Sequence, residues 1–420
     1  MDRRRHPRVP GGGAAHRDRL RPRLRPRRNP LVTDATTAAA ETADGFAKRY
    51  GRPPLGVWSA PGRVNLIGEH TDYNDGFVFP FAIDQRANVA LGSRDDRLVR
   101  VSSTFAPETV ELHLDDLSPE SLAGWSAYPL GVIWALGQFG ADLTALAGVD
   151  LHISSTVPVG AGLSSSAAIE CSVALALDEH WGLGLDRPTL AKVGQLAENR
   201  VVGAPTGILD QSASLLSHAD AAVFLDCRSL DAEVIPLGLA ADGLSILVID
   251  TNVSHAHATG GYAARRASCE AGAATLGVES LRDVHVGDLD RAATVLDDET
   301  FRRVRHIVTE NQRVLDTVRT LREHGAASIG PLLDASHVSM RDDFEISVPE
   351  IDLAVSTAQA NGAIGARMTG GGFGGSAIAL MIDALVPVIE RAVRREFAEQ
   401  GYREPTIFVV RPSEGARRDS

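Results

Sequence analysis

Apolar residues recur along the chain at two spacings, three to four residues apart as in helices and alternately as in strands. From residue 54 to about 114, short alternating runs bounded by Gly, Asp and Pro predict antiparallel strands. Helices are predicted over 37–50, 126–139, 164–181, 188–202, 208–216, 299–324 and 385–399, and further strands over 149–157, 222–225, 233–237, 244–250, 377–382 and 406–411. Because strands and helices come in mixed blocks without strict βαβ alternation, the pattern indicates an α+β protein rather than a doubly wound parallel sheet.

Residues 1–31 differ from all that follows. They hold eleven arginines against two aspartates, repeated proline and glycine, and no periodic apolar face, so the rest of the chain is more acidic than the total of −12. An arginine-rich arm can bind nucleic acid, and an acid-poor start resembles an organellar transit peptide. The prolines prevent an amphipathic helix, and the acidic body opposes nucleic-acid binding. We expect a disordered extension, or a segment upstream of a true start near Val32.

Composition indicates a soluble protein with two or three lobes. The chain has 420 residues, of which 44 % are hydrophobic and 23 % charged, enough to bury a sizeable core. No run reaches the roughly 18 apolar residues of a membrane span, and the best stretch, 376–388, is broken by Asp383. Cys171, Cys227 and Cys269 are odd in number and lack CxxC spacing, which argues against a disulfide framework and a zinc site. We therefore predict a cytoplasmic protein without membrane contact.

The two lysines exclude two enzyme classes. Lys48 and Lys192 each follow alanine, so neither fits the Gly-Lys-Ser/Thr of a P-loop or the strand lysine of a protein kinase. A nucleotide bound by this chain must be held without such a lysine.

The segment 158–168, PVGAGLSSSAA, follows a predicted strand and opens a predicted helix. Gly160 and Gly162 allow the backbone to approach an anion, and we expect Ser164 to cap the helix. Exposed N–H groups and the helix dipole favour phosphate at such a position. The alternative is a tight strand-to-helix turn without a ligand.

The segment 62–76 packs Arg63, Glu69, His70, Asp72 and Asp75 between glycines, directly before the apolar run 77–81. Such charge density is costly to bury, and the apolar flank indicates a loop seated on the core. Carboxylates beside an imidazole suit the hydrogen bonding of vicinal hydroxyls. They also suit a metal, and a polar loop without function stays open.

The segment 365–376 holds five glycines within six positions before a predicted strand. Such a stretch is typical of backbone that must come close to a ligand or to another segment, and the alternative is a glycine hinge.

Together these three segments resemble the galactokinase family, a branch of the galacto-, homoserine, mevalonate and phosphomevalonate (GHMP) kinases. Segment 62–73 matches the galactokinase signature, 158–168 is similar to the shared phosphate-binding motif, and 365–375 resembles the third motif. Segments 197–199, 203–211, 251–254 and 341–350 also look like galactokinase sequence, so the resemblance runs from about 45 to 411. It implies a two-lobed fold with mixed and antiparallel sheets, an N-terminal lobe over 32–220, a C-terminal lobe over 221–420, and an active site in the cleft between them.

The resemblance also implies roles for particular residues. Asp210 would face the anomeric hydroxyl of the sugar, with Arg63 beside it to favour its ionised form and to neutralise the transferring phosphoryl group. Galactose hydroxyls would be held by Glu69, His70, Asp72, the backbone of Gly207, and Tyr262. ATP would be bound by Gly160, Ala161, Gly162, Leu163, Ser164, Ser165 and Ser166. Ser166 and Glu198 would be the protein partners of Mg²⁺, which keeps several waters and relies on nucleotide phosphates.

The implied activity is ATP-dependent phosphorylation of α-D-galactose to α-D-galactose 1-phosphate, the first committed step of galactose catabolism. A sister kinase for N-acetylgalactosamine or arabinose is the alternative among enzymes, and a galactose- and ATP-sensing regulator is the alternative outside them. We expect a monomer whose ligands are galactose and ATP, and the acidic body argues against a nucleic-acid partner. Val201 departs from the aromatic residue of many relatives, and we expect this to affect packing near the site. His255 and His257 form a His-X-His that could suit a metal, but it lies in a loop that otherwise looks like galactokinase sequence.

Overall fold

The computed structural model of the protein describes residues 35–254 and 258–420. The extension over 1–31 and the pair His255 and His257 lie outside the described residues. The helices are α1 (Ala35–Tyr50), α2 (Ala127–Gln138), α3 (Ser165–Trp181), α4 (Arg187–Ala197), α5 (Leu209–Leu216), α6 (Ala258–Leu276), α7 (Leu289–Val295), α8 (Asp298–His324), α9 (Gly330–Asp342), α10 (Pro349–Ala360) and α11 (Val386–Gln400). The strands are β1 (Gly56–Asn65), β2 (Phe77–Val78), β3 (Pro80–Ser93), β4 (Leu98–Ser103), β5 (Val110–His113), β6 (Val149–Ser155), β7 (Ala221–Asp226), β8 (Ala232–Pro236), β9 (Leu244–Ser254), β10 (Gly365–Thr369), β11 (Gly374–Ile382), β12 (Thr406–Val410) and β13 (Arg417–Arg418).

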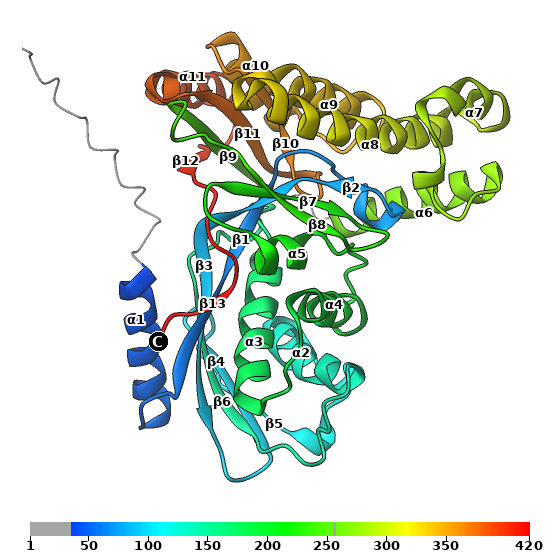
Figure 1. Cartoon of the computed structure of the whole chain (residues 1–420). Coiled ribbons are helices and arrows are strands. Elements are labelled where there is room, and N and C mark those ends of the chain that lie inside the picture. The colour runs from blue at the N-terminus through cyan, green and yellow to red at the C-terminus, as the bar shows by residue number, and fades with distance from the viewer. Residues whose placement is uncertain (1–34, 255–257) are drawn as a thin grey trace, which may run out of the picture.

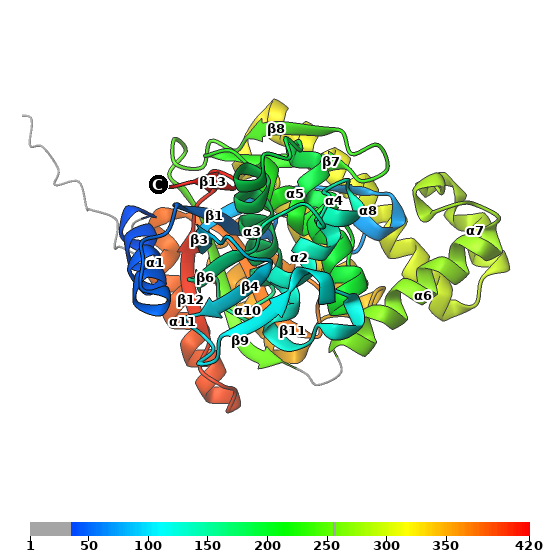
Figure 2. The same ribbon diagram turned by 90° about the horizontal axis from the view of Figure 1, so that it is seen from below.

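A six-stranded sheet with the order β13-β1-β3-β6-β4-β5 forms the lower part of the molecule in Figure 1. Helix α1 covers one face of this sheet, and α2, α3 and α4 lie on the other (Figures 1 and 2). Helix α3 is apolar on nearly all sides because it is buried between the sheet and its neighbouring helices. The prediction of antiparallel strands over 54–114 is confirmed for the pairs β1–β3 and β4–β5. Strand β4 also pairs parallel with β6, which lies outside that range, because the chain passes through α2 before it returns to the sheet.

A four-stranded antiparallel sheet with the order β10-β11-β9-β12 forms the upper part (Figure 1). Helix α10 packs on its strands, α11 packs on α10, and α9 contacts β10. A third sheet, β2-β7-β8, contains strands from both halves of the chain. Mixed helices and sheets of this kind confirm the α+β fold class.

The two halves share an apolar core. One buried cluster joins Val64 and Phe81 of the first half to Val248 and Val314 of the second. The pairing of β1 with β13 also crosses the predicted boundary at 220/221. The assignment of separate lobes over 32–220 and 221–420 therefore stays a prediction, while the shared core holds the segments between the two large sheets in one packed arrangement.

The predicted helix over 188–202 is wrong in its last turn. Helix α4 ends at Ala197, and residues Glu198–Val202 form a single π-helical turn. The carbonyl of Glu198 accepts from the backbone N–H of both Gly203 and Ala204, which widens the turn. Such turns are frequent at functional sites, and this one carries Glu198.

Candidate active site

The three segments singled out in the sequence touch one another. The backbone N–H of Arg63 at the end of β1 donates to the carbonyl of Leu163 over 3.1 Å. A Cβ on Gly370 would lie 2.9 Å from the carbonyl oxygen of Gly162, and the hydroxyl of Ser376 donates to the carbonyl of Ala161 over 2.7 Å. The glycines of the third segment therefore permit close approach between backbones, which favours this interpretation over a hinge.

Arg63 and Asp210 form an ion pair where the first two segments meet. The Nε and Nη2 atoms of Arg63 lie 2.8 and 2.7 Å from Oδ1 of Asp210. Nη1 of Arg63 donates to the carbonyl of Gly162 over 2.6 Å, and Arg63 is only 6 % exposed. Asp210 lies in the first turn of α5. One buried guanidinium thus links the carboxylate to the loop expected to bind phosphate.

The prediction that Ser164 caps helix α3 is wrong. Ser164 has a left-handed backbone with φ 56° and makes no side-chain capping bond; its hydroxyl instead donates to Oδ2 of Asp210 over 2.5 Å. The contact with α5 offers Ser164 a charge-assisted bond, which is stronger than a bond to a backbone N–H. Gly160 and Gly162 have φ 80° and 73°, a region that favours glycine. The loop therefore places Ser164 in contact with the carboxylate of Asp210, and the first turn of α3 follows directly after this residue.

A cavity of about 180 Å³ lies against the Arg63–Asp210 pair. It is lined by Arg63, Glu69, His70, Asp72, Thr206, Gly207, Leu209, Asp210, Tyr262, Gly370 and Gly371. All seven residues predicted for the sugar and for catalysis are among these. The sequence did not single out Thr206, Leu209, Gly370 and Gly371 as lining residues. Only their positions in the sequence could have indicated them. Thr206 and Leu209 flank Gly207 and Ile208, and Gly370 and Gly371 belong to the glycine-rich third segment.

His70 is neutral and fully engaged within the chain. Its Nε2 lies 3.1 Å from the carbonyl oxygen of Gly371 and its Nδ1 lies 2.7 Å from the hydroxyl of Tyr73. Because a carbonyl only accepts, Nε2 carries the proton and Nδ1 accepts from Tyr73. Burial lowers the pKa of His70 to about 3. The ring also packs against Tyr262, with centroids 4.8 Å apart. A sugar hydroxyl that bound a ring nitrogen of His70 would have to replace one of these two bonds.

Asp72 begins a short 3-10 helix (Asp72–Asn74) and points at Gly207. Its Oδ1 accepts from the backbone N–H of Tyr73 over 3.0 Å. Burial, and then the negative charge of Asp210, raise the pKa of Asp72 to about 6. This carboxyl therefore changes its protonation close to neutral pH, unlike an ordinary aspartate.

Ser166, in the segment expected to bind phosphate, contacts Glu198. The hydroxyl of Ser166 donates to Oε1 of Glu198 over 2.9 Å, while Oε2 of Glu198 accepts from Thr206 and Gln211 over 2.8 and 2.9 Å. Glu198 is 5 % exposed, and burial together with the charge of Asp210 raises its pKa. A cation beside this carboxylate would favour its ionised form, so the oxygen donors fit Mg²⁺. Over 35–254 and 258–420, no group of three or more His, Cys, Asp and Glu side chains could hold a metal ion.

Val201 packs on helix α2. A Cβ on Gly131 of α2 would lie 3.1 Å from Cβ of Val201. A larger aromatic side chain at this position would need a different approach of α2 to the π-helical turn. The expectation that Val201 affects packing beside the site, rather than its chemistry, agrees with this contact.

Comparisons with known proteins identify the family. The galactokinase galactose-binding signature matches residues 44–93, the N-terminal domain of GHMP kinases matches 127–218, and the C-terminal domain of GHMP kinases matches 317–399. The galactokinase of Streptomyces coelicolor is 53 % identical over 383 residues, which cover 90 % of this chain and 98 % of that protein. The galactokinase of Streptomyces lividans is 49 % identical over 378 residues, covering 89 % and 94 %.

Solved structures agree with the sequence matches. The crystal structure of Lactococcus lactis galactokinase complexed with galactose has a TM-score of 0.86 and 33 % identity, covering 90 % of this chain and 99 % of that one. Mevalonate kinase from Methanococcus jannaschii, at 18 % identity and a TM-score of 0.59, covers 85 % and 98 % and shows a common fold. The chain is therefore an enzyme of the galactokinase family, with the fold of the GHMP kinases.

Proposed function

We propose that this enzyme transfers the γ-phosphoryl group of ATP to the anomeric hydroxyl of α-D-galactose, giving α-D-galactose 1-phosphate and ADP. The observation that carries the proposal is the Arg63–Asp210 pair, which lies between the polar cavity and the phosphate loop. The reaction needs a base for a hydroxyl proton, which Asp210 can be, and positive charge for a phosphoryl group, which Arg63 supplies.

Asp210 would accept the proton of the anomeric hydroxyl as the oxygen attacks phosphorus. Its Oδ1 is held by Arg63 and its Oδ2 by Ser164, so the carboxylate has little freedom to rotate. Oδ2 keeps an acceptor site for the substrate, because a carboxylate oxygen offers about two sites and Ser164 occupies one of them. Arg63 would also neutralise charge that develops on the transferring group. Positioning and charge are the main contributions to phosphoryl transfer.

The loop 160–166 would hold the triphosphate. Glycines at 160 and 162 leave room for phosphate oxygens at the start of α3, a helix of 17 residues whose dipole favours an anion there. Ser166 and Glu198 would hold Mg²⁺, which, when bound, neutralises phosphate charge. The other groups of the chain bind and orient the two substrates.

The sugar loop supports galactose over the alternatives. The galactokinase galactose-binding signature matches residues 44–93, which include Glu69, His70 and Asp72. The most similar solved structure named above is complexed with galactose. A non-catalytic sensor is disfavoured because the phosphate loop from Ser164 to Ser166 is complete and Ser164 contacts Asp210.

The purified enzyme should be tested with ATP, Mg²⁺ and a panel of galactose, N-acetylgalactosamine, arabinose and glucose, with ADP release as the readout. We expect the highest kcat/KM with galactose and phosphate on its anomeric oxygen by NMR. A site that hydrogen-bonds particular hydroxyls rejects sugars lacking them strongly. A higher kcat/KM with another sugar would replace galactose as the substrate, and binding without ADP release would indicate a sensor.

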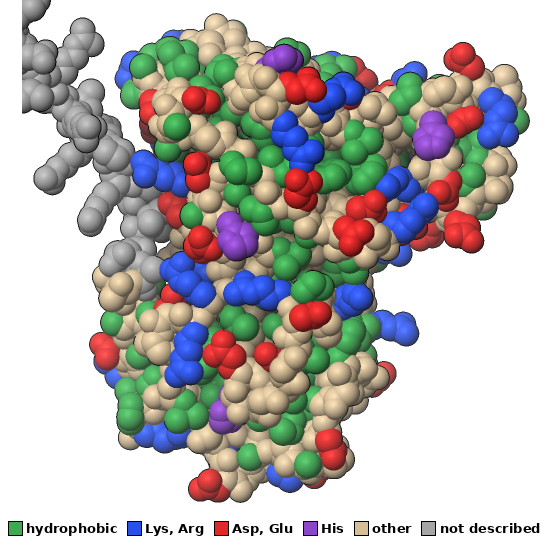
Figure 3. Space-filling model, viewed as in Figure 1, with side chains coloured by type: hydrophobic (Ala, Val, Ile, Leu, Met, Phe, Trp, Pro, Cys, Tyr) green, Lys and Arg blue, Asp and Glu red, His purple; other side chains and the backbone are tan. Residues whose placement is uncertain are grey.

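We further propose that the enzyme is a cytoplasmic monomer without a nucleic-acid partner. No helix within the described parts of the chain is long and apolar enough to cross a membrane. On the face shown in Figure 3, acidic and basic side chains are interspersed rather than gathered in a basic patch. Size-exclusion chromatography with light scattering checks the monomer.

The activity should depend on pH through Asp72. Because its pKa is raised to about 6, Asp72 remains protonated at a pH where an ordinary aspartate is ionised. The ionised form accepts hydroxyl hydrogen bonds, so kcat/KM for galactose should be constant above about pH 7 and fall about tenfold per pH unit well below pH 6. Asp72→Asn should remove this step and lower the plateau roughly 10- to 100-fold. A flat wild-type profile, or the same step in the variant, would contradict the assignment.

Gly207 should not tolerate a side chain. A Cβ at this position would lie 2.0 Å from Oδ2 of Asp72, so Gly207→Ala must displace the carboxylate. We expect the galactose KM to rise at least about tenfold while the ATP KM changes little, since a small displacement of a bound group is costly. Gly260→Ala is the matched control, because a Cβ there meets nothing within 4 Å. Equal galactose KM values for the two variants would show that Asp72 is not held against Gly207.

A further inference from the structure

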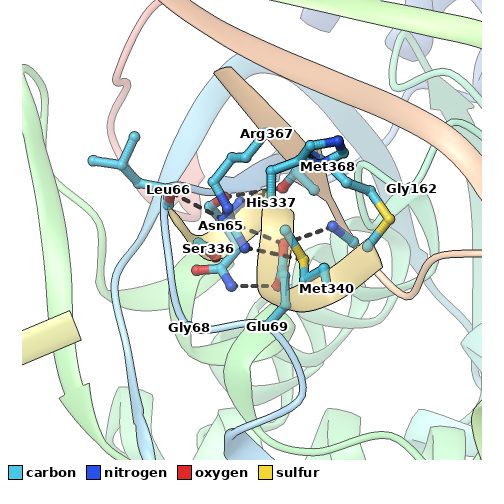
Figure 4. A network of polar contacts seen from close by, with 12 residues as sticks. Asn65, Leu66, Gly68, Glu69, Gly162, Ser336, His337, Met340, Arg367 and Met368 are labelled. Atoms are coloured by element: carbon cyan, nitrogen blue, oxygen red, sulfur yellow. Dashed lines mark hydrogen bonds and ion pairs between the residues drawn. The ribbon is translucent and has the colours of Figure 1, made fainter. Parts of the chain in front are cut away.

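A buried charge network (Figure 4) adjoins Glu69, one of the residues that line the sugar cavity. Arg367 on β10 and Glu310 on α8 are both completely buried, yet neither lines the cavity. Burying charged groups is costly unless they are paired. The family motifs do not account for Glu310, and no catalytic step described above uses either residue.

Arg367 reaches the sugar loop from behind. Its Nη1 donates to the carbonyls of Asn65 and Leu66 over 3.1 and 3.0 Å, and lies 3.7 Å from Oε1 of Glu69. Its Nη2 lies 3.5 Å from Oε1 of Glu310. Arg367 therefore fixes the backbone that leads to Glu69 and places a positive charge beside its carboxylate.

Glu310 holds the same loop through a second contact. Its Oε1 accepts from the backbone N–H of Gly68 over 3.0 Å and from the hydroxyl of Ser336 over 2.7 Å. Its Oε2 accepts from Nε of Arg313 over 2.7 Å. Gly68 immediately precedes Glu69, has φ 102°, and leaves no room for a Cβ, which would lie 2.8 Å from the carbonyl oxygen of Phe77. Glu310 thus holds the loop at Gly68, the residue before the sugar-binding Glu69.

The contacts of Glu69 itself leave acceptor sites free. Its Oε1 accepts from the backbone N–H of Gly370 over 2.7 Å, and its Oε2 accepts from Nδ2 of Asn65. A carboxylate offers about four acceptor sites, so about two remain for hydroxyls in the cavity. Arg367 supplies charge from 3.7 Å, beyond hydrogen-bond distance, and so uses none of them.

The electrostatics agree with this geometry. Burial raises the pKa of Glu69, and the positive charge of Arg367 is the largest effect that acts against it. Burial also acts to raise the pKa of Glu310, but Arg313 and Arg367 outweigh it, and the pKa of Glu310 lies below its usual value. Glu310 therefore stays anionic and can keep Arg367 in place.

We propose that Arg367 and Glu310 are positioning residues that hold Glu69 as an anionic acceptor for two galactose-hydroxyl hydrogen bonds, and so set the affinity and selectivity for the sugar. The proposal rests on the proposed function, because it concerns the galactose-binding role of Glu69. Charge-assisted bonds of this kind are about twice as strong as neutral ones, which gives the network a direct effect on sugar binding.

The test compares Arg367→Met with Arg303→Met. Arg303 is also buried in the same half of the chain, pairs with Glu345, and does not line the cavity. Both variants should lose thermal stability. Only Arg367→Met should raise the galactose KM, by roughly 10- to 100-fold, with the ATP KM within about threefold of wild type. In an Asp72→Asn background, which removes the step assigned to Asp72, kcat/KM for galactose should fall at a higher pH with Arg367→Met than without it, because Glu69 loses its neighbouring cation.

A double-mutant cycle shows whether the effect passes through Glu69. In a Glu69→Gln background, Arg367→Met should add less than about threefold to the galactose KM. Glu310→Gln, which keeps the shape of the side chain, should raise the galactose KM severalfold; it decides the matter if Arg367→Met does not fold. An unchanged galactose KM in the folded variants, or effects that multiply with Glu69→Gln, would overturn the proposal.

The failure of the proposed function gives a different result. If the wild-type enzyme does not phosphorylate galactose, the function is wrong and the network has no sugar to select. If the wild type is active and Glu69→Gln raises the galactose KM while both Arg367→Met and Glu310→Gln leave it unchanged, only the role of the network is wrong.

Discussion

Asp210→Asn is expected to lower kcat by about 10³-fold while galactose still binds. An amide keeps the size of the carboxylate but cannot accept the hydroxyl proton, and general-base catalysis contributes typically 10²–10⁴-fold. The carboxylate acts mainly on the transition state, so kcat should fall much more than galactose binding. Initial rates of ADP release give kcat, and the rise of the melting temperature with added galactose reports binding, since a ligand at 100 times Kd stabilises by about 2.7 kcal/mol.

Asp290→Asn is the matched control for this variant. Asp290 is likewise a first-turn aspartate, in α7, and is exposed and outside the cavity. Its kcat should equal that of the wild type. A kcat of Asp210→Asn within about tenfold of the wild type would remove Asp210 from its proposed role as the base.

Arg63→Met should lower kcat by about 10²–10³-fold, the typical effect of removing one preorganised donor from a transition state. It removes the bonds to Asp210 and to the carbonyl of Gly162, and it leaves Asp210 without its cation. Arg63→Lys should rescue this only partly, because an ammonium cannot make the forked contact of a guanidinium. Steady-state kinetics at saturating galactose and ATP measure the loss.

Arg86→Met controls for the burial of a guanidinium. Arg86 is also 6 % exposed, lies on the neighbouring strand β3, and bonds Ser59 and the carbonyls of Glu414 and Gly415. It should lower the melting temperature but leave the kcat of the folded enzyme unchanged. If Arg63→Met kept a kcat within threefold of the wild type, charge neutralisation by Arg63 would be contradicted.

Most elements could be predicted because their signal is local. The helices predicted over 37–50 and 299–324 are confirmed as Ala35–Tyr50 and Asp298–His324. In α8 the apolar positions recur at helical spacing, and Asp297 caps its start by accepting from the N–H groups of Glu299 and Thr300. Such features depend on neighbouring residues only, so one sequence is enough to find them.

The misses occur where distant segments meet. Serine is a residue type that favours the start of a helix. The backbone of Ser164 is nevertheless left-handed, and its hydroxyl donates to Asp210, 46 residues further on. Residues 198–202 have helical spacing, but the turn widens where Glu198 accepts from Thr206 and Gln211. In both places a bond to a carboxylate outweighs the local preference of the chain.

The sequence by itself determined the α+β class and the family, and it predicted the residues of a sugar loop and a phosphate loop, because all of these are encoded in contiguous segments with fixed spacing. The tertiary structure decided which residues from elsewhere in the chain support them. Glu310 and Arg367 belong to no short pattern shared with Glu69, and they lie more than 240 residues from it in the chain. Only the packing of α8 and β10 against the end of β1 brings them close to Glu69. There, burial strengthens the electrostatic interactions between their charges.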